Sequence, residues 1–175
     1  MKLDLDFYER NTVTVARGLL GKVLVLKRDG VEMMGRIIET EAYRGVEDKA
    51  CHASWRKRSS CETLWGPAGH SYVYLTYGVH YMLNLVTERE DFPSAVLVRA
   101  AKPVKNIDSN VEGPGRLTKA FGIDRSFDGK SLISEDFYVA DLGFAVKSVG
   151  CSPRVGIDYA AEPWKSIKWR FFEEW

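Results

Sequence analysis

Alternating apolar and polar residues around tight-turn signals are the feature that most constrains this fold. VLVLKR (23–28) and MGRIIETEAY (34–43) lie on either side of Asp29-Gly30, and Asp-Gly between two such runs is a strong β-hairpin signal. SYVYLTY and YMLNLVT flank Gly78 in the same way. Because strands joined by short turns pair antiparallel, the sequence predicts a mostly antiparallel sheet.

The rest of the chain predicts a few helices and some shorter strands. A helix is expected in TVTVARGLLGK, capped by Thr12 and ended by Gly21, and another in GPGRLTKAFG (113–122). SAVLVRAA (94–101) is a strand expected to end at Lys102-Pro103. Shorter strands are expected in DFYVAD, SPRVGI and KWRFF. This mixture predicts one α+β domain over residues 1–175, with the aperiodic stretch 44–70 as a functional loop.

Composition excludes several classes of protein. Apolar residues make up 45% of the chain and charged residues 28%, which is typical of a globular domain. No apolar run is long enough to cross a bilayer, and MKLDLDFYER lacks the apolar region of a signal peptide. We therefore expect a cytoplasmic protein with no membrane partner. Three cysteines and three histidines without metal-ligand spacing predict neither a disulfide framework nor a metal site.

Basic residues are concentrated in two stretches although the net charge is only +1. Residues 44–58 and 97–119 each contain five basic and two acidic side chains. Such a distribution suits a face that binds a polyanion, and it also suits an ordinary solvated surface.

Two carboxylates at the end of an apolar strand are the first candidate for chemistry. Alternation places Ile37, Glu39, Glu41 and Tyr43 on one face of their strand, which would run from the core into a cleft. A carboxylate at the edge of an apolar pocket can act as a general base toward water. The alternative is a solvent-facing strand end with two acids of no special role.

The second hairpin supplies a further candidate. Tyr77 stands beside Gly78 at its tip, where an aromatic side chain needs a receiver. That receiver is an unstacked base step in DNA, the protein's own core, or a dimer partner. Asn84 on the return strand either reads a base edge or bonds a neighbouring backbone group, and His52 is a lone histidine in a loop.

Five motifs in this order resemble the alkyladenine (3-methyladenine) DNA glycosylase family. They are RIIETEAYRGVEDKACHAS, YVYLTYGVHYMLNLV, VLVRAAKP, GPGRLTKAFGI and RVGI. The resemblance extends from about Val15 to Phe171. It implies a compact domain with a curved antiparallel sheet and a protruding hairpin, which acts as a monomer on double-stranded DNA containing damaged purines and uses no metal or organic cofactor.

The resemblance also implies roles for individual residues. Glu41 matches the carboxylate that deprotonates the attacking water, and Arg99 matches the arginine that positions this water. Tyr43 and Tyr74 match aromatic walls of the base pocket, and His52 matches its histidine. The remaining matches are Asn84, the pocket amide that excludes guanine; Tyr77, the ring that fills the vacated space in the duplex; and Val79 and His80 at the hairpin tip, which faces the groove.

From these matches we expect a monofunctional enzyme of base excision repair. Glu41 activates water, Glu39 is structural, and the product is an abasic site because no lysine nucleophile is implied. Phosphate contacts are expected from the basic stretches: Arg44, Arg56, Lys57, Arg58, Arg116 and Lys119. We expect the protein to be associated with the nucleoid, or nuclear in a eukaryote.

Three other functions remain compatible with the sequence. They are a DNA-damage-binding module of the same fold without activity, an enzyme acting on free nucleosides, and a structural domain with Tyr77 in a dimer interface.

Overall fold

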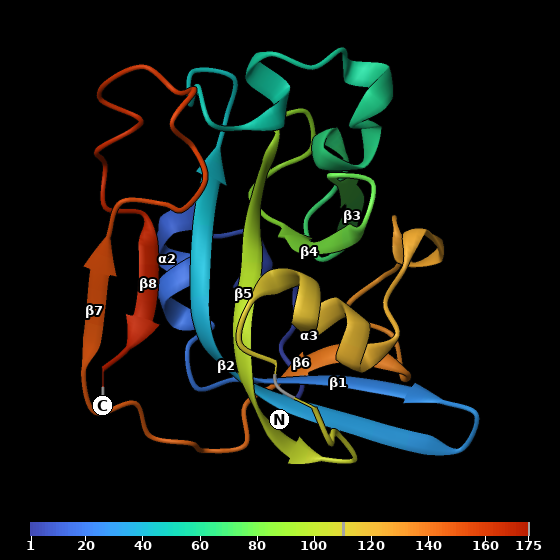
Figure 1. Cartoon of the computed structure of the whole chain (residues 1–175). Helices are drawn as coiled ribbons and strands as arrows, with labels where there is room; N and C mark the ends of the chain where they lie inside the picture. The colour runs from blue at the N-terminus through green and yellow to red at the C-terminus, as the bar shows by residue number, and fades with distance from the viewer. Residues whose placement is uncertain (110, 175) are drawn as a thin grey trace.

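Two long strands, β2 (Val31–Arg44) and β5 (Ser94–Lys105), form the centre of the sheet in the computed structural model (Figure 1). The structure describes residues 1–109 and 111–174. In this part of the chain the sheet has eight strands in the order β3-β4-β5-β2-β1-β6, and β8 pairs with both β2 and β7. Every pairing is antiparallel. The remaining strands are β1 (Val23–Arg28), β3 (Ser71–Thr76), β4 (His80–Val86), β6 (Phe137–Ala140), β7 (Val149–Ser152) and β8 (Arg170–Glu173). The predicted α+β class is confirmed.

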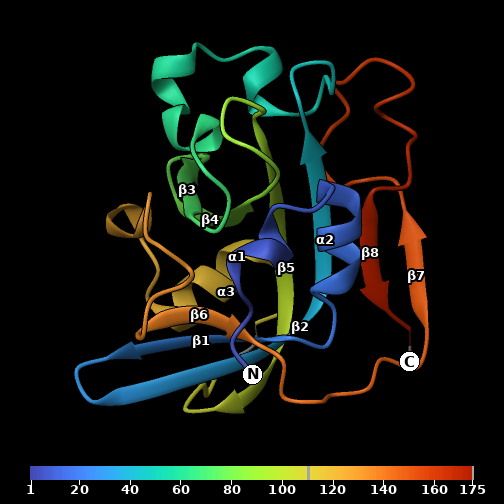
Figure 2. The ribbon, with the colours of Figure 1, turned by 180° about the vertical axis from the view of Figure 1, so that it is seen from behind.

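The helices are short and pack against the sheet. They are α1 (Leu5–Tyr8), α2 (Thr12–Gly18) and α3 (Pro114–Phe121). Helix α2 lies against the side of β2 that Figure 2 presents, and the main core includes Val15 from α2, Leu19 directly after it, and Leu117 and Phe121 from α3. No helix among the described residues has the length and apolar character needed to span a bilayer.

Both predicted hairpins are present. Asp29 and Gly30 connect β1 to β2 with φ of 52° and 76°, the left-handed conformation that a tight Asp-Gly turn requires. Tyr77 and Gly78 connect β3 to β4 with φ of 51° and 66°. The Val79 amide closes this second turn on the Thr76 carbonyl at 3.1 Å.

The helix predicted at 113–122 is also confirmed, since α3 begins at Pro114 and ends at a left-handed Gly122. The predicted cap of α2 at Thr12 is wrong, and α2 ends at Gly18, before the predicted Gly21. Asn11 caps α2 by accepting from the Val13 and Thr14 amides, whereas the Thr12 hydroxyl donates to Glu88 at 2.6 Å.

Two strand boundaries differ from those expected. β5 continues through Pro103 to Lys105, because Pro103 lies opposite Gly35 at a register shift where its missing N–H does not interrupt the pairing. SPRVGI is a loop, not a strand: β7 ends at Ser152, directly before Pro153, and Gly156 has a φ of 74°.

Strict alternation also fails in β2. The pairing with β5 shifts register between Ile37 and Glu39 and again between Glu39 and Thr40. Ile37 therefore lies in the main core with Ala42, not on the face shared by Glu39 and Glu41. An irregularity of this kind re-aims side chains, and it is common beside active sites.

After Arg44, the last residue of β2, segment 44–70 has no regular strand or α-helix. It contains three 3₁₀ turns: η1 (His52–Ser54), η2 (Arg58–Ser60) and η3 (Glu62–Trp65). A second apolar cluster fastens the segment to the sheet through Cys51, Cys61 and Leu64 against Tyr72 and Val86. Figure 1 shows the segment at the same end of the molecule as the loop after β7.

Candidate active site

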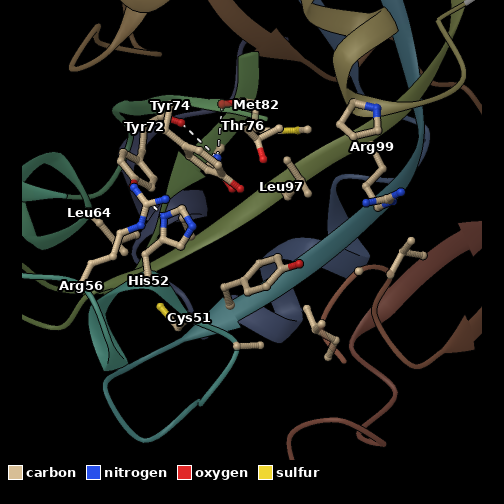
Figure 3. Close-up of a pocket in the computed structure, with 18 of the residues that line it drawn as sticks. Cys51, His52, Arg56, Leu64, Tyr72, Tyr74, Thr76, Met82, Leu97 and Arg99 are labelled. Atoms are coloured by element: carbon tan, nitrogen blue, oxygen red, sulfur yellow. Dashed lines mark hydrogen bonds between the residues drawn. The ribbon is translucent and has the colours of Figure 1, made fainter. Parts of the chain in front are cut away.

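A pocket of about 380 Å³ opens between the β3–β4 hairpin, segment 44–70 and the loop after β7. Most of the residues expected to form the site line this pocket: Tyr43, His52, Tyr74, Tyr77, Asn84 and Arg99. Figure 3 shows His52, Tyr72 and Tyr74 converging on one side of it, with Arg99 on the opposite side. The fold thus brings together residues that are far apart in the sequence.

Glu41 lies behind the wall of the pocket and not at its open edge. Its side chain has 0% exposure. One carboxylate oxygen accepts from the Val155 amide at 2.6 Å, and the other accepts from the Tyr43 hydroxyl at 2.7 Å. Arg99 Nη1 is 3.5 Å from the second oxygen. All three of these neighbours line the pocket, so the carboxylate is one layer from its surface.

Burial also sets the protonation behaviour of Glu41. Removal from water raises the pKa of this carboxyl, and this effect outweighs the lowering by Arg99, Val155 and Tyr43. A raised pKa makes the ionised form a stronger base than an exposed glutamate.

Glu39 holds the arginine of the site. Its Oε1 accepts from Arg99 Nε at 2.9 Å and from Arg170 Nε at 2.7 Å. Arg99 therefore spans both carboxylates, with Glu39 as the closer contact. This geometry agrees with the expected structural role for Glu39.

A fully buried ion pair supports the loop that contacts Glu41. Arg154 donates to Asp48 at 2.6 and 2.9 Å, and neither side chain is exposed. The Arg154 guanidinium also lies 4.7 Å from the centre of the Tyr43 ring. The pair holds Arg154 in place, and with it the adjacent Val155 amide. Arg154 in turn packs on Tyr43, which forms one wall of the pocket. No role for Arg154, Asp48 or Val155 was predicted from the sequence. The available signal was the RVGI motif, to which no site residue was assigned.

His52 is tied into the aromatic side of the pocket. Its Nδ1 is 2.8 Å from the Tyr72 hydroxyl, and its ring centre is 4.3 Å from that of Tyr74. Burial, with a smaller contribution from the charge of Arg56, lowers the pKa of His52 to about 4. The imidazole is therefore neutral at physiological pH.

Asn84 presents its amide oxygen to the pocket. Its nitrogen donates to the backbone carbonyls of Tyr72 at 3.2 Å and Met82 at 3.4 Å. These two acceptors fix the orientation of the amide, which leaves the oxygen as the polar atom available to a ligand.

The hairpin tip is exposed beside the pocket. Tyr77 is 89% exposed and Val79 69%. Tyr77 has a positive φ, which is uncommon for a residue with a side chain and typical of positions under functional constraint.

Helix α3 supports the hairpin from one side. Thr118 donates to the Tyr81 carbonyl at 2.8 Å, and His80 packs against Gly115 so closely that a Cβ there would lie 2.8 Å from its ring. Val79, His80 and Arg116 do not line the pocket.

The proposed phosphate contacts differ in their surroundings. Arg44 is paired with Glu88, and Arg58 is paired with Glu62 and Asp91. Arg116 and Lys119 are exposed on α3. Arg56 lines the pocket.

Comparison with known proteins identifies the family. The model of the methylpurine-DNA glycosylase family matches residues 6–174. A Legionella pneumophila (strain Lens) relative is 47% identical over 98% of this chain and 93% of its own length. Relatives from Anaeromyxobacter dehalogenans (strain 2CP-C) and Desulfitobacterium hafniense (strain Y51) are 45% and 41% identical, covering 98% and 99% of this chain and 83% and 95% of their own. Each carries the name "Putative 3-methyladenine DNA glycosylase".

An α+β domain with a buried carboxylate behind an aromatic pocket is suited to an enzyme that encloses a planar group. The chain belongs to the methylpurine-DNA glycosylase family, and it is accordingly a DNA glycosylase, a DNA-repair protein whose substrate is DNA.

The Asp48–Arg154 pair gives a prediction about stability. Asp48→Asn leaves the buried Arg154 charge without a counter-ion, so we expect a loss of about 3–5 kcal/mol in the free energy of unfolding. Urea denaturation measures it. Asp91→Asn, which removes an exposed partner of Arg58, is the matched control and should cost no more than about 1 kcal/mol. Equal costs for the two variants would contradict the structural role of the pair.

Gly115 gives a prediction about the hairpin. In Gly115→Ala the new methyl group must displace the His80 ring, so we expect duplex affinity to fall by about tenfold. Fluorescence anisotropy measures it. In a His80→Ala background the same change should have almost no effect, because the clash is gone. A similar loss in both backgrounds would show that the contact does not position the hairpin.

Proposed function

We propose that this protein removes alkylated or deaminated purines, such as 3-methyladenine and hypoxanthine, from double-stranded DNA by hydrolysis and leaves an abasic site. The observation that carries the proposal is the Glu41 carboxylate. It is buried behind a base-sized aromatic pocket and contacted by three groups that line it.

Recognition begins with rotation of the damaged nucleotide out of the duplex, because the glycosidic bond cannot be reached inside the stack. The exposed Tyr77 ring enters the vacated space and restores stacking. The base is received by Tyr43, Tyr74 and His52, and stacking on aromatic side chains contributes roughly 1–3 kcal/mol per base. Damaged or poorly paired bases flip most readily, which provides a first stage of selection.

A second stage of selection is chemical. The Asn84 oxygen is an acceptor, so it tolerates a purine edge that donates a hydrogen bond. The amide is held by the Tyr72 and Met82 carbonyls and cannot move aside, so the added bulk of the exocyclic amino group of guanine would clash with it. In this proposal undamaged guanine is excluded by that contact.

Hydrolysis uses a water molecule on the sugar side of the pocket. Glu41 accepts a hydrogen bond from the water and takes its proton as the oxygen bonds to the sugar C1′. The bond from C1′ to the purine nitrogen breaks, and its electron pair leaves with the base. A carboxylate has about four lone-pair positions, so the contacts to Val155, Tyr43 and Arg99 leave one for the water. Negative charge on Glu41 also stabilises the positive charge that develops on the sugar.

The protein works as a monomer in this proposal, in the compartment that holds the chromosome. Arg116 and Lys119, exposed on α3 beside the hairpin, are the phosphate contacts that set the register of the duplex without reading its sequence.

The two carboxylates give the direct test. Glu41→Gln removes the base, so we expect single-turnover excision of hypoxanthine from duplex DNA to fall by about 10²–10⁴-fold. Glu39→Gln acts through Arg99 and Arg170, and should lose at least about tenfold less. Both variants should still bind the lesion duplex. Equal rate losses for the two would overturn the assignment of Glu41.

The pH profile gives an independent test. Excision requires ionised Glu41, and its raised pKa means that the rate falls on acidification at a higher pH than for an ordinary glutamate. A 7-methylguanine duplex suits the measurement, because this cationic base departs without further protonation. Since the pKa of His52 is lowered to about 4, we expect one ascending limb and then a plateau. A descending limb between about pH 5 and 8 would contradict the neutral role given to His52.

A further inference from the structure

Arg56 lies among the aromatic side chains of the pocket. It follows η1, and its guanidinium carbon is 4.9 Å from the centre of the Trp55 ring and 5.7 Å from that of Tyr74. Figure 3 shows Arg56 beside His52 and Tyr72, on the side of the pocket away from Arg99. Its charge is therefore at the end that surrounds the base and not at the end that holds the catalytic carboxylate.

The guanidinium lacks the partners that the other arginines of the site have. Arg99 contacts Glu39 and Glu41, and Arg154 contacts Asp48. No carboxylate in residues 1–109 or 111–174 lies within ion-pair distance of Arg56. Its Nε is buried and has no hydrogen-bond partner in the same part of the chain. A buried donor without a partner is costly in a folded protein, and a ligand that supplies an acceptor relieves the cost.

The charge of Arg56 affects its neighbours. It contributes, after burial, to the lowered pKa of His52, and it lowers the pKa of the Tyr72 and Tyr74 hydroxyls against the larger effect of burial. Each of these neighbours lies within the electrostatic field of the Arg56 charge. A positively charged base placed there would meet the same field.

We propose that Arg56 determines which damaged purines the pocket accepts: it disfavours cationic N-alkylpurines and favours neutral purines that present a carbonyl oxygen, such as hypoxanthine. This inference rests on the proposed function, since it assumes that a flipped purine enters the pocket. Aromatic faces attract cations. Here the rings of Tyr74 and Trp55 already have a cation over them, so a second cation gains less from them and is repelled by the first.

The experiment compares excision of hypoxanthine and 7-methylguanine from otherwise identical duplexes under single-turnover conditions. Both bases have a carbonyl oxygen at the same position, but 7-methylguanine also has the exocyclic amino group that faces Asn84. The change in the rate ratio when Arg56 is replaced therefore reports on charge, because the Asn84 contact is the same in both proteins. In Arg56→Met, which removes the charge and keeps much of the volume, we expect the ratio to shift toward 7-methylguanine by roughly tenfold or more. Arg56→Lys keeps the charge and should hold the ratio within about threefold of the wild type.

Controls distinguish failure of the Arg56 inference from failure of the proposed function. Lys57→Met removes the next charge along the chain, which is exposed, and should change both rates in parallel. An unchanged ratio in Arg56→Met, or an equal shift in Arg56→Lys, overturns the inference while the proposed function stands. If the wild type excises neither base from a duplex, the proposed function itself fails. Thermal unfolding of each variant confirms that the compared proteins are folded.

Discussion

Burial of one ionisable carboxylate, that of Glu41, is the constraint on which the rest of this structure depends. An isolated buried charge costs several kcal/mol unless donors surround it. The sheet irregularity between Ile37 and Thr40 turns Glu39 and Glu41 toward Arg99, and the loop after β7 supplies the Val155 amide. Arg154 and Asp48 then fix that loop. Each of these features makes structural sense because the carboxylate would otherwise be unsatisfied.

The same arrangement divides the pocket into two ends with different chemistry. The end near Arg99 has a carboxylate whose pKa is raised by burial, so its ionised form is a stronger base than an exposed glutamate. The other end is built from aromatic rings, a neutral imidazole and the Arg56 guanidinium, which has no ion-pair partner in the part of the chain that the structure describes. Segment 44–70 supplies most of this second end, and it is irregular because it must place side chains around a cavity rather than extend a sheet. Under the proposed function, the rate of hydrolysis and the choice of damaged base can therefore be altered separately.

Much of the fold followed from local sequence signals, because turns and helix ends are determined by a few neighbouring residues. Asp29-Gly30, the turn at Gly78 and the helix from Pro114 to Gly122 all follow such local rules. Contacts between residues distant in the sequence could not be predicted from such local signals. Alternation misplaced Ile37, because a register shift depends on the partner strand. The Asp48–Arg154 pair joins residues 106 positions apart. The family resemblance predicted which residues surround the pocket. Neither the full burial of Glu41 nor the position of Arg56 could be predicted without the structure.

The most direct test of the account is a crystal structure of the Glu41→Gln variant bound to a duplex with one hypoxanthine. The account predicts the base between Tyr43 and the rings of His52 and Tyr74, and the Tyr77 ring within the DNA stack. It also predicts a water molecule between residue 41 and the sugar C1′. A hypoxanthine that remains stacked in the duplex, or a sugar carbon that faces away from residue 41, would contradict the central claim.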